Sequence, residues 1–291
     1  MLHTRIAPTP SGWLHRGNAF SFVLTWLYAR ASGGTVWLRI DDLDKSRRRR
    51  EYIEDIFVSL RWLGLDWDRG PTDTDDFLQN HSQQLRLAQY QAVADKLREN
   101  GNLFACTCSR KAIRQRSPSG NYPGTCRSRN IPFDAPRTAW RINTTAAKNS
   151  TFQSLTDKVH TVNLDAVMPD FVVRQKNGQA AYMLASVVDD VRAGINFIVR
   201  GQDLYNASAA QSFLAAELAE LRAFRAVRFL HHPLWRDEKG DKLSKSAGAT
   251  ALHSMREAGV PPTAIFHHVA DFLGLPAQET AAGLLEAFRK A

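Results

Sequence analysis

The first forty residues alternate between patterns typical of a strand, a helix and a second strand, and this order constrains the fold more than any other feature. Residues 4–7 and 35–40 predict strands, and the apolar stretch 17–31 between them predicts a buried helix. A strand, a helix and a strand in that order form a βαβ unit with parallel strands. The sequence therefore predicts an α/β fold that starts with a Rossmann-like parallel sheet.

The rest of the chain predicts an insertion into this fold. Hydrophobic residues make up 44% and charged residues 23% of the 291 positions, as in ordinary globular proteins. After two helical patterns at 48–63 and 80–99, a cysteine-bearing segment and short alternating strands interrupt the α/β pattern until about residue 175. We expect four parts: a first Rossmann half (1–100), an insertion (101–175), a second half (176–248) and a short helical tail (249–291) with no further domain.

Cysteine usage predicts a metal site in a reducing compartment. The chain has only Cys106, Cys108 and Cys126, an odd number that does not suit a disulfide framework. Zn²⁺ favours sulfur, and structural zinc sites have four ligands, so a closed tetrahedral site with three thiolates is expected. From coordination chemistry alone, His81 or His160 would be the usual fourth ligand. Because no stretch is long and apolar enough to span a membrane, we expect a cytoplasmic protein without a membrane partner.

Two loops carry residues suited to polyphosphate binding. The segment 8–18 joins the first strand to the first helix, where helix N–H groups and glycines such as Gly12 and Gly17 suit phosphates, and His15 adds a donor. Near the other end, Lys242 and Lys245 lie three positions apart among small residues. Two converging ammonium groups would stabilise charge on a reacting triphosphate. Taken singly, the first loop is better explained as an ordinary βα turn with a buried histidine, and the second as a solvated lysine-rich turn.

Together the two loops resemble the signature pair of class I aminoacyl-tRNA synthetases. His15-Arg16-Gly17-Asn18 matches the histidine-and-glycine motif, and Lys242-Leu243-Ser244-Lys245-Ser246 matches the lysine-serine motif. The resemblance implies a split Rossmann domain that uses ATP with Mg²⁺. It implies catalytic roles for His15, Lys242 and Lys245, and ATP contacts from His15, Gly17, Asn18 and Lys245.

Further motifs are similar to those of the glutamyl branch of this class. The chain opens with Arg5-Ile6-Ala7-Pro8-Thr9, has Asp41 after the second strand, and carries Tyr182 and Arg200 later in the same order. The family usually has Glu at the position of Asp41, so the side chain here is one methylene shorter. Two arginine guanidinium groups and one carboxylate suit a substrate that has two carboxylates and one ammonium group. The resemblance implies that glutamate is bound by Arg5, Ala7, Thr9, Asp41, Tyr182 and Arg200.

The cysteine segment resembles the zinc site of glutamyl-queuosine tRNA(Asp) synthetases. In that family Cys106, Cys108 and Cys126 would hold a structural Zn²⁺ together with Tyr122 as the fourth ligand. Only 45 residues follow Ser246, fewer than an anticodon-binding domain needs. The resemblance implies an enzyme that transfers L-glutamate to queuosine in the anticodon of tRNA(Asp). Because the sequence shows no evident association helix, we expect a monomer. A truncated glutamyl-tRNA synthetase that charges a 3′ end, or a non-catalytic RNA-binding paralogue, would share these motifs.

The net charge of +9 fits an RNA partner. Residues 100–133 contain six basic side chains and no acid, so phosphates are expected to bind there with strong salt dependence. A second basic run, 47–50, falls near the start of a helix. It would either bind an external anion or pair with Asp41, Asp42 and Asp44. The basic residues of the first segment are Arg110, Lys111, Arg114, Arg116, Arg127 and Arg129.

Overall fold

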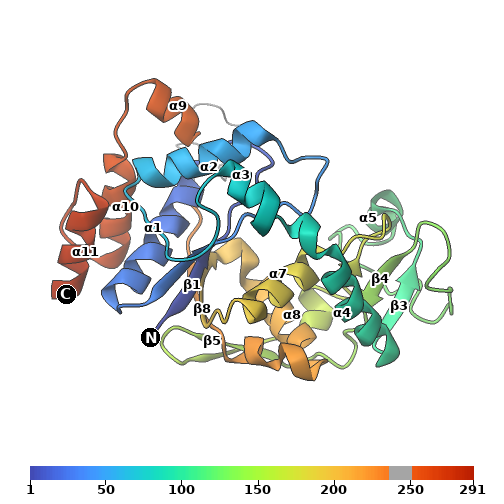
Figure 1. Cartoon of the computed structure of the whole chain (residues 1–291). Helices are drawn as coiled ribbons and strands as arrows, with labels where there is room; N and C mark the ends of the chain where they lie inside the picture. Colours follow the sequence, from blue (N-terminus) through green and yellow to red (C-terminus); the bar gives the residue numbers. More distant parts are fainter. Residues whose placement is uncertain (236–250) are drawn as a thin grey trace. The chain divides into compact units, whose positions relative to one another are not determined.

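The computed structural model describes residues 1–235 and 251–291, which form two compact units. Unit 1 consists of Met1–Leu85, Ile195–Gln202 and Leu230–Ala291, and unit 2 of Arg86–Gly194 and Asp203–Phe229. Figure 1 shows the elements of both units. Lys242 and Lys245 lie outside the described residues, and the expected division into four sequence parts stays a prediction.

Unit 1 contains the expected βαβ unit. β1 (His3–Ile6) and β2 (Thr35–Leu38) are parallel, in a register that runs from His3 opposite Thr35 to Ile6 opposite Leu38, and α1 (Arg16–Ala31) connects them. Gly34 allows the return into β2, because a Cβ there would lie 2.2 Å from the Leu2 carbonyl oxygen. β8 (Phe197–Gly201) packs beside β1. The predicted α/β class is confirmed.

α1 is buried on almost every side, as its continuous apolar sequence predicts. It packs against β1 and β8 and also against α10 (Thr263–Leu273) and α11 (Ala281–Lys290). Tyr28 shows this arrangement, because its ring contacts Phe197 of β8 and Phe288 of α11 at centroid distances of 5.6 and 5.1 Å. The predicted helical tail is thus confirmed as a cover for α1, together with α9 (Leu252–Glu257).

The second and third predicted helices differ from expectation in their starts. α2 (Arg50–Trp62) begins two residues late. The pattern at 80–99 holds a π turn, η1 (Phe77–His81), and a 3₁₀ turn, η2 (Gln83–Arg86), before α4 (Leu87–Glu99) begins. The reason is a tertiary contact: the Asp42 carboxylate accepts from the Ser82 hydroxyl at 2.6 Å and the Gln83 N–H at 2.7 Å. α3 (Thr74–Asp76) precedes η1.

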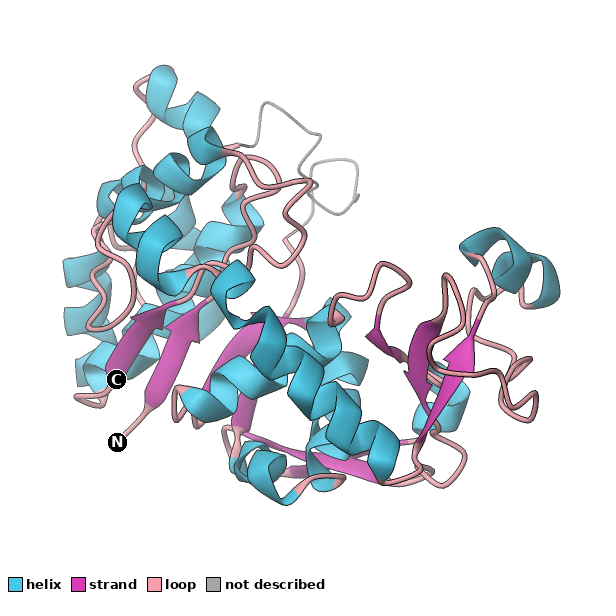
Figure 2. Ribbon diagram, turned by 45° about the vertical axis from the view of Figure 1, so that its right-hand side comes forward, coloured by secondary structure: helices cyan, strands magenta, loops and turns pink. Residues whose placement is uncertain are grey.

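Unit 2 contains a three-stranded antiparallel sheet in the order β3-β4-β7 (Figure 2). Its strands are β3 (Leu103–Cys106), β4 (Ala139–Ile142) and β7 (Val172–Arg174), and α5 (Arg110–Arg116) and α6 (Leu164–Val167) lie between them in sequence. The small antiparallel strands expected between 137 and 173 are therefore confirmed. The sequence Lys176-Asn177-Gly178 also predicts a hairpin turn, and the structure has a turn there, with Gly178 at a φ of 86°.

The remainder of unit 2 is a hairpin and a helical layer. β5 (Ser150–Ser154) pairs with β6 (Val159–Val162) antiparallel and with the start of β9 (Arg228–His232) parallel. The apolar pattern of residues 206–221 also predicts a helix, but the observed helix is shorter. α8 (Tyr205–Ala216) stops where Asn100 and Asn102 hydrogen-bond Glu217, and the chain continues as a 3₁₀ helix, η4 (Ala219–Ala226). The short 3₁₀ helix η3 (Gln202–Leu204) precedes α8.

An ion pair joins Arg86, the last residue of η2, to Asp189 of α7 (Tyr182–Arg192) in unit 2. The Arg86 guanidinium donates to both Asp189 oxygens at 3.0 and 3.1 Å, and the Tyr90 hydroxyl lies 2.9 Å from each. Burial, followed by the charge of Asp189, raises the pKa of Tyr90 well above its usual value. No described helix combines the length and apolar character that crossing a bilayer requires.

Candidate functional site

His15 is the N-cap of α1 and forms a reciprocal capping box with Asn18. The His15 ring Nδ1 accepts from the Asn18 N–H at 3.2 Å, and the Asn18 side-chain oxygen accepts from the His15 N–H at 3.1 Å. A neutral imidazole whose Nδ1 is an acceptor carries its proton on Nε2. The cap therefore fixes a ring N–H donor at the positive end of the α1 dipole, where an anion is favoured.

Gly17 makes room for this ring. A Cβ at Gly17 would lie 3.1 Å from both Cε1 and Nδ1 of His15, closer than ordinary van der Waals contact. Glycine at this position therefore lets His15 fold over the first turn of α1. The predicted ATP contacts of Gly17 and Asn18 stay predictions, and the capping geometry gives both residues a structural role as well.

The loops that follow β1 and β2 run side by side at the carboxyl ends of the strands. The Arg39 N–H donates to the Ile6 carbonyl at 2.9 Å, and the Asp41 N–H donates to the Pro8 carbonyl at 2.8 Å. The structure thereby brings two predicted glutamate contacts, Ala7 and Thr9, close to a third, Asp41. Ligands of open parallel sheets bind at this edge.

Asp41 is buried and paired within the protein. Arg39 donates from Nε to one Asp41 oxygen at 2.7 Å and from an Nη to the other at 3.2 Å, and both side chains are buried. Sequence analysis did not identify Arg39. Arg39 and Asp41 lie two positions apart, and in an extended chain this spacing places two side chains on the same side. The sequence could therefore have predicted that they pair.

Arg5 and Arg200 are both buried, on β1 and β8 of unit 1. The two strands are tied at their start, where the Asn196 N–H donates to the His3 carbonyl at 2.9 Å and the Asn196 side chain accepts from the His3 N–H at 2.8 Å. Tyr182 is the first residue of α7 in unit 2 and is 41% exposed. Its predicted contact with glutamate stays a prediction.

The described residues on either side of 236–250 both lie in unit 1 against α1 or the loop before it. Ala251 pairs with His15 in an isolated antiparallel bridge, and the Leu252 N–H donates to the Leu14 carbonyl at 2.8 Å. On the other side, the Trp235 ring stacks on His268 of α10 at 4.1 Å and contacts Phe20 of α1. Trp235 and Ala251, the described residues that precede and follow this part of the sequence, thus contact α1 or its N-cap.

α9 fixes the later of these two ends. The His253 ring stacks on Trp13 of the loop before α1, with centroids 4.0 Å apart. Arg256 hydrogen-bonds Asp55 of α2 and donates to the Ser59 hydroxyl at 2.7 Å. Asp55 is 4% exposed, so this ion pair lies in the interior.

The three cysteines of unit 2 form a compact cluster. Their Sγ atoms lie within 4.8 Å of one another, and those of Cys108 and Cys126 are 3.6 Å apart. The Tyr122 hydroxyl lies 3.4 Å from the Cys106 Sγ and accepts from the Cys126 N–H at 2.8 Å. The resemblance had placed these four residues together, and the structure does so.

The two histidines that coordination chemistry offered as a fourth ligand lie elsewhere. His160 Nδ1 is 2.8 Å from the Tyr205 hydroxyl, and its ring stacks on Phe152. His81 lies 3.6 Å from Asp76 in unit 1. Among the described residues, neither joins the cysteine cluster.

The thiols of the cluster differ in acidity. Burial opposes ionisation of the Cys126 thiol, but hydrogen bonds from the Tyr122 hydroxyl and the Thr107 N–H outweigh it and lower its pKa to about 7. Burial raises the pKa of Cys108 to about 11, and burial also raises the pKa of Tyr122. One thiolate near neutral pH among close sulfurs attracts a cation.

The basic residues of the cysteine segment fall into two groups. α5 packs its buried Ile113 against the cysteine cluster and exposes Arg110, Lys111, Arg114 and Arg116. Arg127 differs, because its Nη2 lies 2.7 Å from the fully buried carboxylate of Asp170. Arg127 therefore balances an internal charge and does not add to the exposed basic surface as sequence counting assumed.

Three of the four arginines in the second basic run, Arg48, Arg49 and Arg50, are paired within the protein. Arg48 lies 2.9 Å from Asp42, one of the three expected partners, and Arg50 lies 2.8 Å from both Glu54 and Asp75. Arg49, the N-cap of α2, lies 3.6 Å from Glu51. These contacts favour the pairing interpretation of residues 47–50 over an external anion.

A histidine-capped helix after the first strand of a parallel βαβ unit is the arrangement of a class I tRNA synthetase. Comparison with known proteins agrees: residues 1–282 match the family "tRNA synthetases class I (E and Q), catalytic domain". The chain therefore belongs to the class I tRNA synthetases, a family of ATP-dependent ligases, in their E and Q branch.

Individual relatives narrow the resemblance. The chain is 35% identical to Glutamyl-Q tRNA(Asp) synthetase of Nitratidesulfovibrio vulgaris, over 94% of this chain and 87% of the relative. It is 39% identical to the protein of the same name from Synechococcus sp., over 97% and 87%. The predicted similarity to glutamyl-queuosine tRNA(Asp) synthetases is confirmed. Glutamate–tRNA ligase of Anaeromyxobacter sp. is 36% identical, but the chain covers only 56% of its length.

Solved structures support the fold. The glutamate-tRNA synthetase of Elizabethkingia anophelis superimposes with a TM-score of 0.77 at 22% identity, over 99% of this chain. The chain spans 65% of the length of that structure. At this level of identity the likeness establishes the class I synthetase fold of the chain.

Proposed function

We propose that the protein activates L-glutamate with ATP and transfers it to queuosine in the anticodon of tRNA(Asp). In the first step a glutamate carboxylate oxygen attacks the α-phosphorus of ATP. The bond from this phosphorus to the oxygen that it shares with the β-phosphate breaks, so that pyrophosphate departs and glutamyl-adenylate is formed. In the second step a hydroxyl of queuosine attacks the activated carbonyl and AMP leaves. The names and the 34–39% identities of the relatives support this substrate pair.

The single observation that carries the activation step is the His15 cap beside the ends of the lysine-bearing segment. The ring Nε2–H and the first turn of α1 present donors where a phosphate group would bind. The antiparallel bridge from His15 to Ala251 joins this loop to the chain that follows Lys242 and Lys245. We assign phosphate contacts to His15, Gly17, Asn18 and Lys245, with Lys242 as a second cation and Mg²⁺ bound with ATP.

Glutamate would bind at the carboxyl ends of β1 and β2. Buried Arg5 and Arg200 offer guanidinium groups to its carboxylates, next to the loops of Ala7 and Thr9. Asp41 is assigned to the glutamate ammonium from the resemblance; within the protein its carboxylate accepts two hydrogen bonds from Arg39 and one from the Gln83 side-chain amide at 3.4 Å. Tyr182 is assigned to the same substrate from the resemblance.

The cysteine cluster would hold a structural Zn²⁺ through Cys106, Cys108, Cys126 and Tyr122. Tetrahedral ligands at about 2.3 Å from zinc lie about 3.8 Å apart, which the sulfur separations of up to 4.8 Å approach. Four protein ligands leave no open position, so the ion would supply folding energy and not catalysis. Because Ile113 packs on the cluster, zinc would also hold α5 with its basic residues toward solvent.

Those exposed residues of α5 are proposed to contact RNA phosphates. Arg110, Lys111, Arg114 and Arg116 have no carboxylate in their segment, and such groups release counterions when they bind a phosphate backbone. The net charge of +9 favours the same partner.

Two assays test the proposal. Glutamate-dependent exchange of labelled pyrophosphate into ATP should occur with Mg²⁺, whereas aspartate and glutamine should support little exchange. No exchange with glutamate, with or without tRNA, would refute activation. Labelled glutamate should then be transferred to tRNA(Asp) that contains queuosine, and not to the same tRNA without it.

A second candidate is transfer to a tRNA 3′ end, which the 36% identity to a glutamate–tRNA ligase favours. The two are separated by tRNA that lacks its 3′-terminal adenosine. Such tRNA(Asp) should still accept glutamate if queuosine is the acceptor, and tRNA(Glu) should be charged only in the other case.

A further inference from the structure

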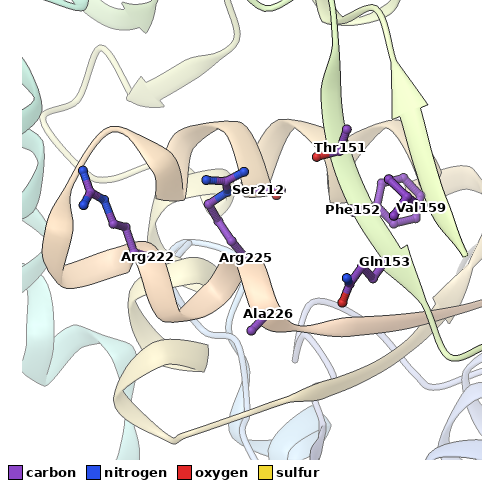
Figure 3. Close-up of a pocket in the computed structure, with 8 residues that line it drawn as sticks. All are labelled: Thr151, Phe152, Gln153, Val159, Ser212, Arg222, Arg225 and Ala226. Atoms are coloured by element: carbon purple, nitrogen blue, oxygen red, sulfur yellow. The ribbon is translucent and has the colours of Figure 1, made fainter. Parts of the chain in front are cut away.

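A pocket of about 420 Å³, lined by both polar and apolar residues, lies in unit 2 between the β5–β6 hairpin on one side and α8 and η4 on the other (Figure 3). Its volume is within the range of small-ligand sites. None of its lining residues takes part in the activation site or the cysteine cluster. Its polar groups come from Thr151, Gln153, Ser212, Arg222 and Arg225.

Arg222 and Arg225 stand on the same side of η4. In a 3₁₀ helix residues three apart are eclipsed, and one turn rises by about 6 Å. Figure 3 shows both side chains leaving the same side of this helix. The pocket therefore has two guanidinium groups in a row along one wall.

Neither guanidinium forms a hydrogen bond or an ion pair with any residue that the structure describes. Neighbouring cations do have partners: Arg228 lies 2.9 Å from Asp157, and Lys96 lies 2.5 Å from Glu220. Two like charges that share a concave surface without a carboxylate attract an anion. A planar guanidinium matches phosphate oxygens in paired hydrogen bonds.

The opposite wall supplies neutral hydrogen-bonding groups. Thr151 and Gln153 are two residues apart on β5, so they face the same side, and Figure 3 places their polar ends toward η4. The buried Ser212 of α8 adds a third group. Within the described chain the side chains of these three residues also lack hydrogen bonds, so their donors are available to a ligand.

We propose that this pocket binds a phosphate ester, held by Arg222 and Arg225 and contacted by Thr151, Gln153 and Ser212. Two cations one turn apart suit consecutive phosphates of a strand as well as a single nucleotide. The ester comes either from an RNA backbone or from a free ribonucleotide. The RNA source rests on the proposed function, whereas the affinity of the pocket for phosphate does not.

The test compares the full chain with the double variant Arg222→Gln/Arg225→Gln. One probe is uridine 5′-monophosphate, measured by calorimetry with saturating ATP so that the activation site is filled. The other is a tRNA(Asp) transcript, measured by filter binding over a salt series. We expect about tenfold weaker binding of at least one probe, and for RNA a salt slope lower by about 2. Glutamate-dependent pyrophosphate exchange should be unchanged, which keeps this test apart from the proposed function.

Two further variants separate the pocket from net charge and from misfolding. Arg289→Gln/Lys290→Gln removes two exposed charges from α11 in unit 1 and should leave binding of the monophosphate unchanged. Ala226→Trp keeps both arginines but fills the pocket, and should weaken the same probe as the double variant does. Loss of monophosphate binding alone would identify a nucleotide site, and loss of RNA binding alone a backbone site. Unchanged binding of both probes, or equal losses in the α11 variant, would overturn the proposal.

Discussion

The His15 loop of unit 1 and the cysteine cluster of unit 2 are both identified by short motifs, but they are held in different ways. At His15, ring and backbone atoms are paired with Asn18, so protein groups alone fix the geometry. In the cluster, three sulfurs lie within 4.8 Å of one another, and any thiolates there would repel until a cation binds. The His15 cap is held by protein groups, whereas we expect the proposed zinc to hold the cysteine cluster, so changes at the first site should affect reactivity and changes at the second should affect stability.

The largest expected effect is therefore metal removal. A chelator should release about one zinc per chain and lower the thermal stability of the protein by several kcal/mol, since binding of a structural zinc is also folding free energy. Zinc content and circular dichroism melts measure this. Tyr122→Phe should weaken zinc binding by about tenfold or more while the ring remains.

His160→Ala is the matched control, because His160 bonds Tyr205 and is outside the cluster. Its zinc content should equal that of the parent protein. An equal melting temperature with and without zinc would contradict the expectation that the cysteine cluster, unlike the His15 cap, is stabilised by a metal ion.

The next largest effect is His15→Asn. Asparagine is a favourable N-cap, so the start of α1 should be kept, but the ring Nε2–H donor is lost. We expect pyrophosphate exchange to slow by about 10²–10³-fold with little change in melting temperature. Lys245→Ala should have a similar effect on rate. An exchange rate of His15→Asn equal to the parent rate would limit His15 to capping.

A smaller effect is expected for Arg256→Gln, which removes the ion-pair partner of buried Asp55 and frees the end of the chain that pairs with His15. The variant should lose about 2 kcal/mol in chemical denaturation. A double-mutant cycle with Asp55→Asn isolates the pair. Additive losses in that cycle would show that Arg256 does not act through Asp55.

The smallest effect on stability is expected on α5. Arg110→Gln/Arg114→Gln should leave melting unchanged but lower the salt slope of tRNA binding by about 2. Arg127→Gln should lower the melting temperature but leave the salt slope of tRNA binding unchanged, because the buried Asp170 carboxylate loses its guanidinium partner. The same slope change in both variants would contradict the distinction between exposed and paired cations.

Apolar patterns in the sequence predicted most elements of the fold. The βαβ start, the small antiparallel strands and the tail helices follow from local periodicity. Gly274 and Pro276 also predict a break in the helical tail, and Gly274 ends α10 at a φ of 68°. Close spacing also grouped Cys106, Cys108 and Cys126 before the fold was known, whereas Tyr122 was added only by the family resemblance. Such features depend on residues close in sequence.

Tertiary pairing was the part that sequence could not supply. The carboxylate of Asp42 stops the predicted helix at 80–99 from starting before Leu87, although 40 residues separate Asp42 from Ser82. Charge counting likewise treated Arg127 as exposed, because its partner Asp170 lies 43 positions away. Hydrogen bonds and ion pairs of this kind depend on which distant segments come into contact, and local sequence patterns do not predict those contacts.

The chain passes between the two units four times, at residues 85/86, 194/195, 202/203 and 229/230. Neither unit is a continuous stretch of sequence, so a growing polypeptide cannot finish unit 2 before Phe229 has left the ribosome, or unit 1 before its tail helices follow. At about 5–20 residues per second, the early strands β1 and β2 wait on the order of ten seconds or more for the partners that bury them. During synthesis these strands are the part of the protein that depends most on protection from aggregation.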